Sequence, residues 1–257
     1  MWNDAIALLP NPQAWMLYFF CAMLIGISKT GVQNVGTFAV PIFAFLFGAK
    51  YSTGIVLILL CFADLIAVIY YRKKFIWKEV RSMLPFAFFG LIIGLFVGEF
   101  IDDKAFKFLM GFCILISVLL MLWGINKSKK ENGIQDFTKH RWYAPFFGLL
   151  VGFSTMIGNA AGPALTIYLL TKKLDKISLV ATGAWFIMIL NFSKIPLQLF
   201  VWKNLSWEGL ALNIMAIPFI LLGGFLGIKL VKVLPEKEFK IIILTLVIIS
   251  ACMLMIG

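Results

Sequence analysis

The chain has 257 residues, of which 62% are hydrophobic and only 14% are charged, and its formal net charge is +11. Soluble domains contain about 25% charged and about 45–50% apolar residues, so this composition excludes an ordinary soluble protein. The positive residues stand in short loops between apolar runs, as membrane topology requires, and this distribution argues against a nucleic-acid-binding surface.

In chain order, hydropathy predicts ten apolar helices in an all-α polytopic membrane protein. The expected segments are residues 13–28, 35–49, 52–71, 83–100, 105–124, 144–158, 160–171, 178–202, 208–230 and 239–256. The first two segments of each half have about 12 to 16 residues, whereas a spanning helix needs roughly 20. They are therefore either short spans or the two arms of a re-entrant hairpin.

Lysine and arginine are distributed unevenly between alternate loops. One set of loops holds 17 of them, whereas the other set holds only Lys50, Lys104, Lys107 and Lys203. The positive-inside rule places the richer side in the cytoplasm, so we expect both termini outside. The richer set comprises Arg72, Lys73, Lys74, Lys78, Arg81, Lys127, Lys129, Lys130, Lys139, Arg141, Lys172, Lys173, Lys176, Lys229, Lys232, Lys237 and Lys240.

Two stretches of the chain look like copies of one another. Gly26–Pro41 begins with Gly-Ile-Ser-Lys-Thr-Gly, and Gly152–Pro163 begins with Gly-Phe-Ser-Thr-Met. At an offset of 130, Trp77 also matches Trp207, and Gly94 matches Gly224. Each half contains five segments, and an odd number requires that the second half be inverted in the membrane. We expect an N-terminal repeat over residues 1–126, a basic cytoplasmic linker over 127–143 and a C-terminal repeat over 144–257.

Ionisable side chains inside apolar segments are candidates for function, because each is costly to insert into a membrane. Asp64 and Lys194 lie deep in two such segments, and the offset of 130 makes them equivalent in the two repeats. We expect both to face the interface between the halves as coupling or gating residues, or alternatively to form a structural ion pair. Lys29 is a loop residue if the first segments span, but lies near the bilayer midplane if they form a hairpin.

The two glycine-rich breaks are expected to be non-helical over Ser28–Asn34 and Ser154–Asn159, and to meet at the middle of the membrane. Helices that begin near Asn34 and Asn159 would then direct their N-termini inward, where unpaired backbone N–H groups and the positive dipole end favour anions. The sequence therefore predicts a site for a small oxyanion. Its expected residues are Ser28, Lys29, Thr30, Gly31, Gln33, Asn34, Ser154, Thr155, Gly158, Asn159, Asn191 and Lys194.

At this point the chain resembles the sulfite exporter TauE/SafE family of membrane transporters, over about residues 13–256. The resemblance rests on Gly26–Pro41 followed by Gly54, on its echo Gly152–Pro163 followed by Gly183, and on the duplicated hydropathy. It implies export of small sulfur-containing anions such as sulfite, or transport of sulfonates, in a bacterial cytoplasmic membrane. It also implies that the two glycine-rich stretches bind the substrate.

The favoured function is a secondary transporter that exports such an anion by alternating access between the two repeats. An anion channel of the same architecture is the alternative, and a membrane-embedded enzyme is a weaker one.

The single histidine, His140, and four scattered cysteines supply no catalytic, metal or cofactor site. No GxxxxGK[ST] motif is present, so ATP coupling within this chain is not expected. The expected partners are a small anion and the lipid bilayer, not nucleic acid, and a homo-oligomer is compatible with the sequence.

Overall fold

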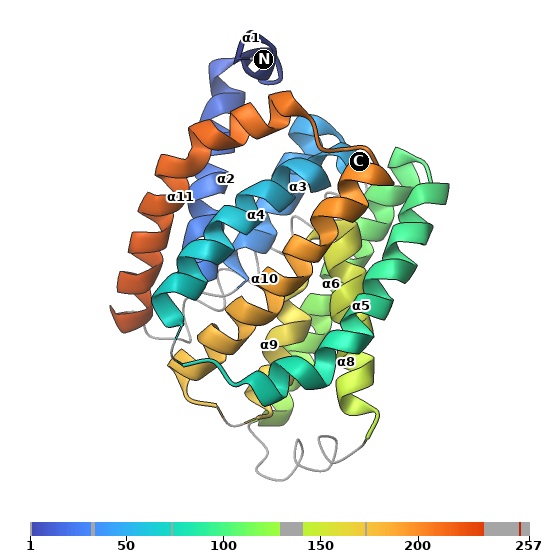
Figure 1. Ribbon diagram of the computed structural model, residues 1–257, viewed down its shortest axis with the longest axis vertical. Helices are drawn as coiled ribbons and strands as arrows, with labels where there is room; N and C mark the ends of the chain where they lie inside the picture. The colour runs from blue at the N-terminus through green and yellow to red at the C-terminus, as the bar shows by residue number, and fades with distance from the viewer. Residues whose placement is uncertain are drawn as a thin grey trace.

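The computed structural model describes residues 2–31, 34–72, 74–128, 141–172, 174–233 and Cys252 (Figure 1). Throughout these residues the fold is helical, as predicted. The elements are α1 (Trp2–Ala7), α2 (Pro12–Thr30), the 3-10 helix η1 (Val35–Phe38), α3 (Ala39–Phe47), α4 (Ala49–Tyr71), α5 (Trp77–Phe100), α6 (Asp103–Ser128), α8 (Tyr143–Gly158), α9 (Gly162–Leu170), α10 (Lys176–Phe200) and α11 (Trp207–Val233). The predicted tenth segment, 239–256, lies outside the described residues apart from Cys252.

Four of these helices, α4, α5, α10 and α11, are long and apolar enough to cross a membrane. Large apolar side chains remain exposed on them, for example Phe89 and Phe96 on α5 and Phe225 on α11. Such exposure is costly in water but suits a surface that faces lipid. The chain is therefore a multi-pass membrane protein.

The short predicted segments at the start of each half differ in length. Helix α2 has 19 residues, which at 1.5 Å per residue gives roughly 28 Å, close to the thickness of the hydrocarbon core. The apolar helical stretches Val35–Phe47 and Tyr143–Gly158 are shorter, and α9 has only nine residues. A helix of nine residues spans only about half of the hydrocarbon core.

Polar caps determine where several helices begin. The Asn11 side chain accepts a hydrogen bond from the Ala14 backbone N–H at 2.8 Å, and Pro12 occupies the first turn of α2. At α10, the Asp175 carboxylate accepts from the N–H groups of Ile177 and Ser178, both at 3.1 Å. These side chains replace hydrogen bonds that the first turn of a helix cannot make internally.

Glycines bring the first helix of each half against the fourth helix of the other half. A Cβ on Gly26 of α2 would lie 2.3 Å from the Ile220 carbonyl oxygen of α11, and one on Gly152 of α8 would lie 1.9 Å from that of Ala87 in α5. These distances leave no room for a side chain, so the helices approach backbone to backbone. The pairs α2–α11 and α8–α5 are thus packed in the same way.

The matched contacts also correct one sequence alignment. Gly94 packs on the Phe153 carbonyl and Gly227 packs on the Ile27 carbonyl, and Phe153 lies 126 positions after Ile27. Gly94 therefore corresponds to Gly227, at an offset of 133, and not to Gly224. Pro85 and Pro218, each inside its helix, have the same offset of 133. Similar apolar composition along α11 hid this shift of about one helical turn from the sequence comparison.

Two clusters of buried apolar side chains form the core. One lies mainly on α5, α6, α8 and α9 and includes Met83, Phe106 and Tyr168. The other lies mainly on α2, α3, α4 and α11 and includes Tyr18 and Phe43. Helices α4 and α10 cross the molecule side by side and run in opposite directions, whereas α5 and α11, which also run in opposite directions, lie at opposite edges of it (Figure 1).

Candidate functional site

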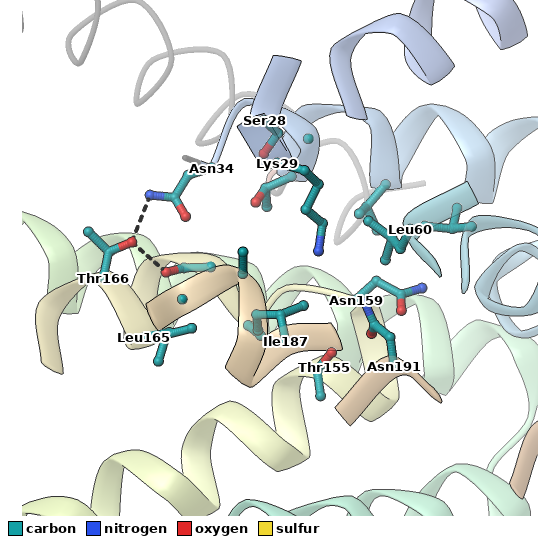
Figure 2. Close-up of a pocket in the computed structure, with 18 of the residues that line it drawn as sticks. Ser28, Lys29, Asn34, Leu60, Thr155, Asn159, Leu165, Thr166, Ile187 and Asn191 are labelled. Carbon is teal, nitrogen blue, oxygen red and sulfur yellow. Dashed lines mark hydrogen bonds between the residues drawn. The ribbon is translucent and has the colours of Figure 1, made fainter. Parts of the chain in front are cut away.

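A cavity of about 80 Å³ lies where the two chain breaks face α4 and α10 (Figure 2). Leu60 and Ile187, which line it, are close to the midpoints of the spanning helices α4 and α10, so the cavity lies at about half their depth. This volume has room for a few waters or one small ion. The lining residues are Ser28, Lys29, Asn34, Gly36, Thr37, Val40, Val56, Leu60, Thr155, Asn159, Ala161, Gly162, Leu165, Thr166, Val180, Gly183, Ala184, Ile187 and Asn191.

The breaks themselves are shorter than predicted. Helix α2 continues through Thr30 and α8 continues through Gly158, so Ser28–Thr30 and Ser154–Gly158 are helical, which the sequence analysis had wrong. The Gly31 N–H still donates to the Ile27 carbonyl, and the Asn159 N–H donates to that of Thr155. Because these hydrogen bonds persist, small polar residues in the last turn do not interrupt the helix.

Asparagine shapes both breaks. Asn34 has φ of 76° and Asn159 has φ of 51°, in the left-handed region that asparagine tolerates better than most residues. Helix η1 starts directly after Asn34, and α9 starts at Gly162. A Cβ on Gly162 would lie 2.2 Å from Asn34 Oδ1, so this glycine lets the two breaks meet. Asn34 Nδ2 also donates to Thr166 Oγ1 at 3.4 Å (Figure 2).

Lys29 extends from the end of α2 into the cavity (Figure 2). Its Nζ lies 2.6 Å from Asp64 Oδ1, and the Asp64 side chain is completely buried. Asn191 of α10 donates from Nδ2 to Asp64 Oδ2 at 2.6 Å. The carboxylate is therefore held between a lysine of one half and an asparagine of the other.

Lys194 of α10 is also completely buried. Its Nζ donates to the Thr155 carbonyl oxygen at 2.8 Å, to Thr155 Oγ1 at 3.4 Å and to Asn159 Oδ1. The cation lies immediately behind two side chains that line the cavity, so its charge acts on the cavity without direct exposure to it.

The structure confirms that Asp64 and Lys194 are buried in the protein interior. Among the described residues, however, the ion pair of Asp64 is with Lys29 and not with Lys194. The sequence comparison predicted that Asp64 and Lys194 occupy equivalent positions of two helices, but such a comparison says nothing about which neighbour each side chain reaches. That partner depends on how α2 packs against α4.

The predicted site residues differ in where the structure places them. Six of them line the cavity: Ser28, Lys29, Asn34, Thr155, Asn159 and Asn191. Lys194 lies behind this lining, and Gln33 lies outside the described residues. The remaining four, Thr30, Gly31, Ser154 and Gly158, pack between helices.

Contacts of this last group show how they pack. The Thr30 hydroxyl donates to the Gly224 carbonyl of α11 at 2.7 Å, whereas the buried Ser154 hydroxyl donates within α8, to the Leu150 carbonyl at 2.7 Å. A Cβ on Gly31 would meet the Gly227 backbone at 2.3 Å. A substrate contact for these residues stays a prediction. Thr37 and Thr166 line the cavity but were not predicted.

A polar network closes the cavity on the side of the loop that follows α10. Asn159 Nδ2 donates to the Thr53 carbonyl at 3.3 Å, and Asn204 Nδ2 donates to Thr53 Oγ1 at 2.9 Å. Gly54 adds a close contact, since its Cβ would lie 2.3 Å from the Asn204 carbonyl oxygen. Beyond this network lies a second cavity of about 250 Å³, lined in part by Tyr51 and Asn213.

The chain was also compared with models of known protein families. The family model described as sulfite exporter TauE/SafE matches residues 18–254, nearly the whole chain. Neither the curated proteins nor the solved structures gave a match.

Proposed function

Because the chain belongs to the sulfite exporter TauE/SafE family, we propose that it is a secondary transporter that exports a small sulfur-containing anion. The substrate is sulfite or an organosulfonate, and the membrane is the bacterial cytoplasmic membrane. The observation that carries this proposal is the small cavity at mid-depth, which has Lys29 in its lining and the buried Lys194 behind it.

The chemistry of the lining supports an anion as the ligand. Helix η1 and helix α9 both begin at the cavity, with Gly36 and Gly162 in its lining. Backbone N–H groups at such ends are donors for anions, and glycine allows a ligand to approach them. The lysine ammonium groups add longer-range attraction, which is strong where water is scarce.

The paired contacts support an inverted repeat, with the halves 1–126 and 144–257 joined by the linker 127–143. Each half packs its first helix on the fourth helix of the other half, and the equivalent helices α4 and α10 run in opposite directions (Figure 1). Inverted repeats of this kind bind substrate near the midplane, between the repeats. We infer that the two halves rock about the cavity and that the pseudo-two-fold axis lies in the membrane plane.

The position of the polar network supports alternating access. The lining of the cavity continues along α10 from Asn191 to Val180, toward the end predicted to face the cytoplasm. On the opposite side, Thr53 and Asn204 separate it from the larger cavity. An anion would enter from the cytoplasm and leave after the contacts between Asn159, Thr53 and Asn204 open.

The membrane potential is sufficient to drive export. A potential that is negative inside favours anion efflux by about 2.3 kcal/mol per charge per 100 mV. Uniport therefore needs no second ion, and Asp64 is the residue that would couple a proton if one is used.

Purified protein in proteoliposomes tests the proposal. We expect saturable uptake of labelled sulfite, with competition by an organosulfonate, and counterflow when the vesicles are preloaded with unlabelled substrate. Lys29→Gln should reduce uptake at least about tenfold because a cavity cation is lost, whereas Lys104→Gln, at an exposed position of α6, should behave as wild type. Folded protein that transports none of these anions would overturn the proposal, and uptake without counterflow would indicate a channel.

A further inference from the structure

We propose that the cavity selects a monovalent oxyanion and rejects a divalent oxyanion of the same size. The discrimination follows from the charged side chains that the described residues bring to the site, which are the buried Asp64 and Lys194 and the partly buried Lys29, and which sum to +1. This inference rests on the proposed function and adds to it the charge of the substrate and the residue that sets it, Asp64.

Lys29 is the single ionisable side chain among the described residues that line the cavity. Its positive charge is compensated by Asp64, 2.6 Å away. Together the two are neutral, so they add little net attraction for an arriving anion. What remains is the charge of Lys194.

The oxygen neighbours of Lys194 suit an ammonium group. An ammonium has three donors and no acceptor, and Nζ of Lys194 has three oxygen atoms within hydrogen-bond distance, from Thr155 and Asn159. All three are neutral. Within the described residues, therefore, this buried cation has no carboxylate within hydrogen-bond distance, and the site keeps a charge of +1.

A monovalent anion brings this site to neutrality. A divalent anion would leave a net charge of −1 in a region that holds little water, where an uncompensated charge is costly. Size cannot provide the same discrimination, since sulfate and methanesulfonate are both tetrahedral and have nearly the same volume. Sulfite exists as both hydrogen sulfite and the dianion near neutral pH, and the site would take the hydrogen sulfite form.

Asp64 is the residue that keeps the charge at +1 rather than +2. It is connected to the cavity through two lining residues, Lys29 and Asn191, each 2.6 Å from one of its oxygen atoms. It does not line the cavity itself, so it acts as a positioning residue through charge. Asp64→Asn raises the charge of the site to +2, and Lys29→Gln together with Asp64→Asn returns it to +1.

Uptake of labelled methanesulfonate and labelled sulfate into proteoliposomes, at equal ionic strength, tests the inference. We expect wild type to prefer methanesulfonate at least about tenfold, which is about 1.4 kcal/mol. Asp64→Asn should lower this ratio at least about tenfold, and the double variant should keep the wild-type ratio. Glu99→Gln removes one negative charge from an exposed position at the end of α5 and should leave the ratio unchanged.

The ratio separates charge selection from a loss of folding, because it compares two anions on the same protein. If Asp64→Asn yields no folded protein, the inference is tested on wild type in detergent, by comparing how much each anion raises the unfolding temperature. The anion that binds more tightly stabilises more, so methanesulfonate should stabilise more than sulfate. Equal transport or equal stabilisation by methanesulfonate and sulfate would overturn the inference and leave the transporter function intact. Absence of transport for every sulfur anion would instead overturn the proposed function.

Discussion

The ammonium group of Lys29 lies 2.6 Å from the carboxylate of Asp64 and connects the end of α2 to α4. The equivalent positions of the second half, Thr155 and Lys194, are also in contact, with Lys194 Nζ 2.8 Å from the Thr155 carbonyl. If the two halves are repeats, as we propose, both use the same two positions for a buried polar contact. In the first half the cation is on the short helix, whereas in the second half it is on the long one.

The Lys29–Asp64 pair should show a large coupling free energy in a double-mutant cycle. Lys29→Met alone leaves a buried carboxylate without its cation, which should lower the free energy of unfolding by about 3–5 kcal/mol. Lys29→Met with Asp64→Leu removes both charges and should cost much less. Unfolding of the purified variants in detergent measures both values. If the loss in the double variant equals the sum of the losses in Lys29→Met and in Asp64→Leu, each measured alone, the pair is not coupled.

Hydropathy predicted the helices well, but it misplaced ends that carry polar residues. The fourth segment was predicted over 83–100, whereas α5 begins at Trp77. Its first turns contain Lys78, Glu79 and Arg81, which lower local hydropathy without preventing a helix. The same limitation hid the helical conformation of Ser28–Thr30, since backbone hydrogen bonds, and not hydropathy, decide where α2 ends.

The sequence predicted most of the charged residues of the candidate site, but it did not predict which side chains contact one another. Asp64, Lys194 and Lys29 stood out because ionisable groups are rare in apolar segments. Their partners depend on how far α2 and α10 extend beside α4, and no sequence pattern encodes that register. Thr37 and Thr166 were missed because both lie outside the two predicted breaks, Ser28–Asn34 and Ser154–Asn159.

Close packing of glycine should make Gly152 intolerant of any side chain. Its Cβ would lie 1.9 Å from the Ala87 carbonyl oxygen, so Gly152→Ala must push α8 away from α5. We expect a loss of about 1–3 kcal/mol or more in the free energy of unfolding. Gly209→Ala is the matched control, since the nearest atom there is the Ser206 hydroxyl at 3.3 Å. Thermal unfolding of the two variants in detergent should rank Gly152→Ala clearly lower, and equal stability would contradict the packing described.

The predicted orientation in the membrane can be checked with single cysteines. The exposed Cys252 is changed to serine, and Cys21, Cys61 and Cys113 are buried. Lys104→Cys and Arg141→Cys then place one thiol on each side, at exposed positions. Intact cells treated with an impermeant maleimide should be labelled at position 104, and labelling at 141 should require permeabilised cells. The opposite pattern would reverse the topology derived from the lysine and arginine distribution.

Lys194 should be required for anion transport although it does not line the cavity. Lys194→Met keeps most of the side-chain volume but removes the buried ammonium, so the net charge of the site falls from +1 to zero. It also leaves the Thr155 carbonyl and Asn159 Oδ1 without the donor that they share. We expect anion uptake in proteoliposomes to fall at least about tenfold, whereas Lys104→Met, at an exposed position, should retain it. Normal uptake by folded Lys194→Met would show that this lysine only stabilises the break at Asn159, and Lys29 would then be the cation that attracts the substrate.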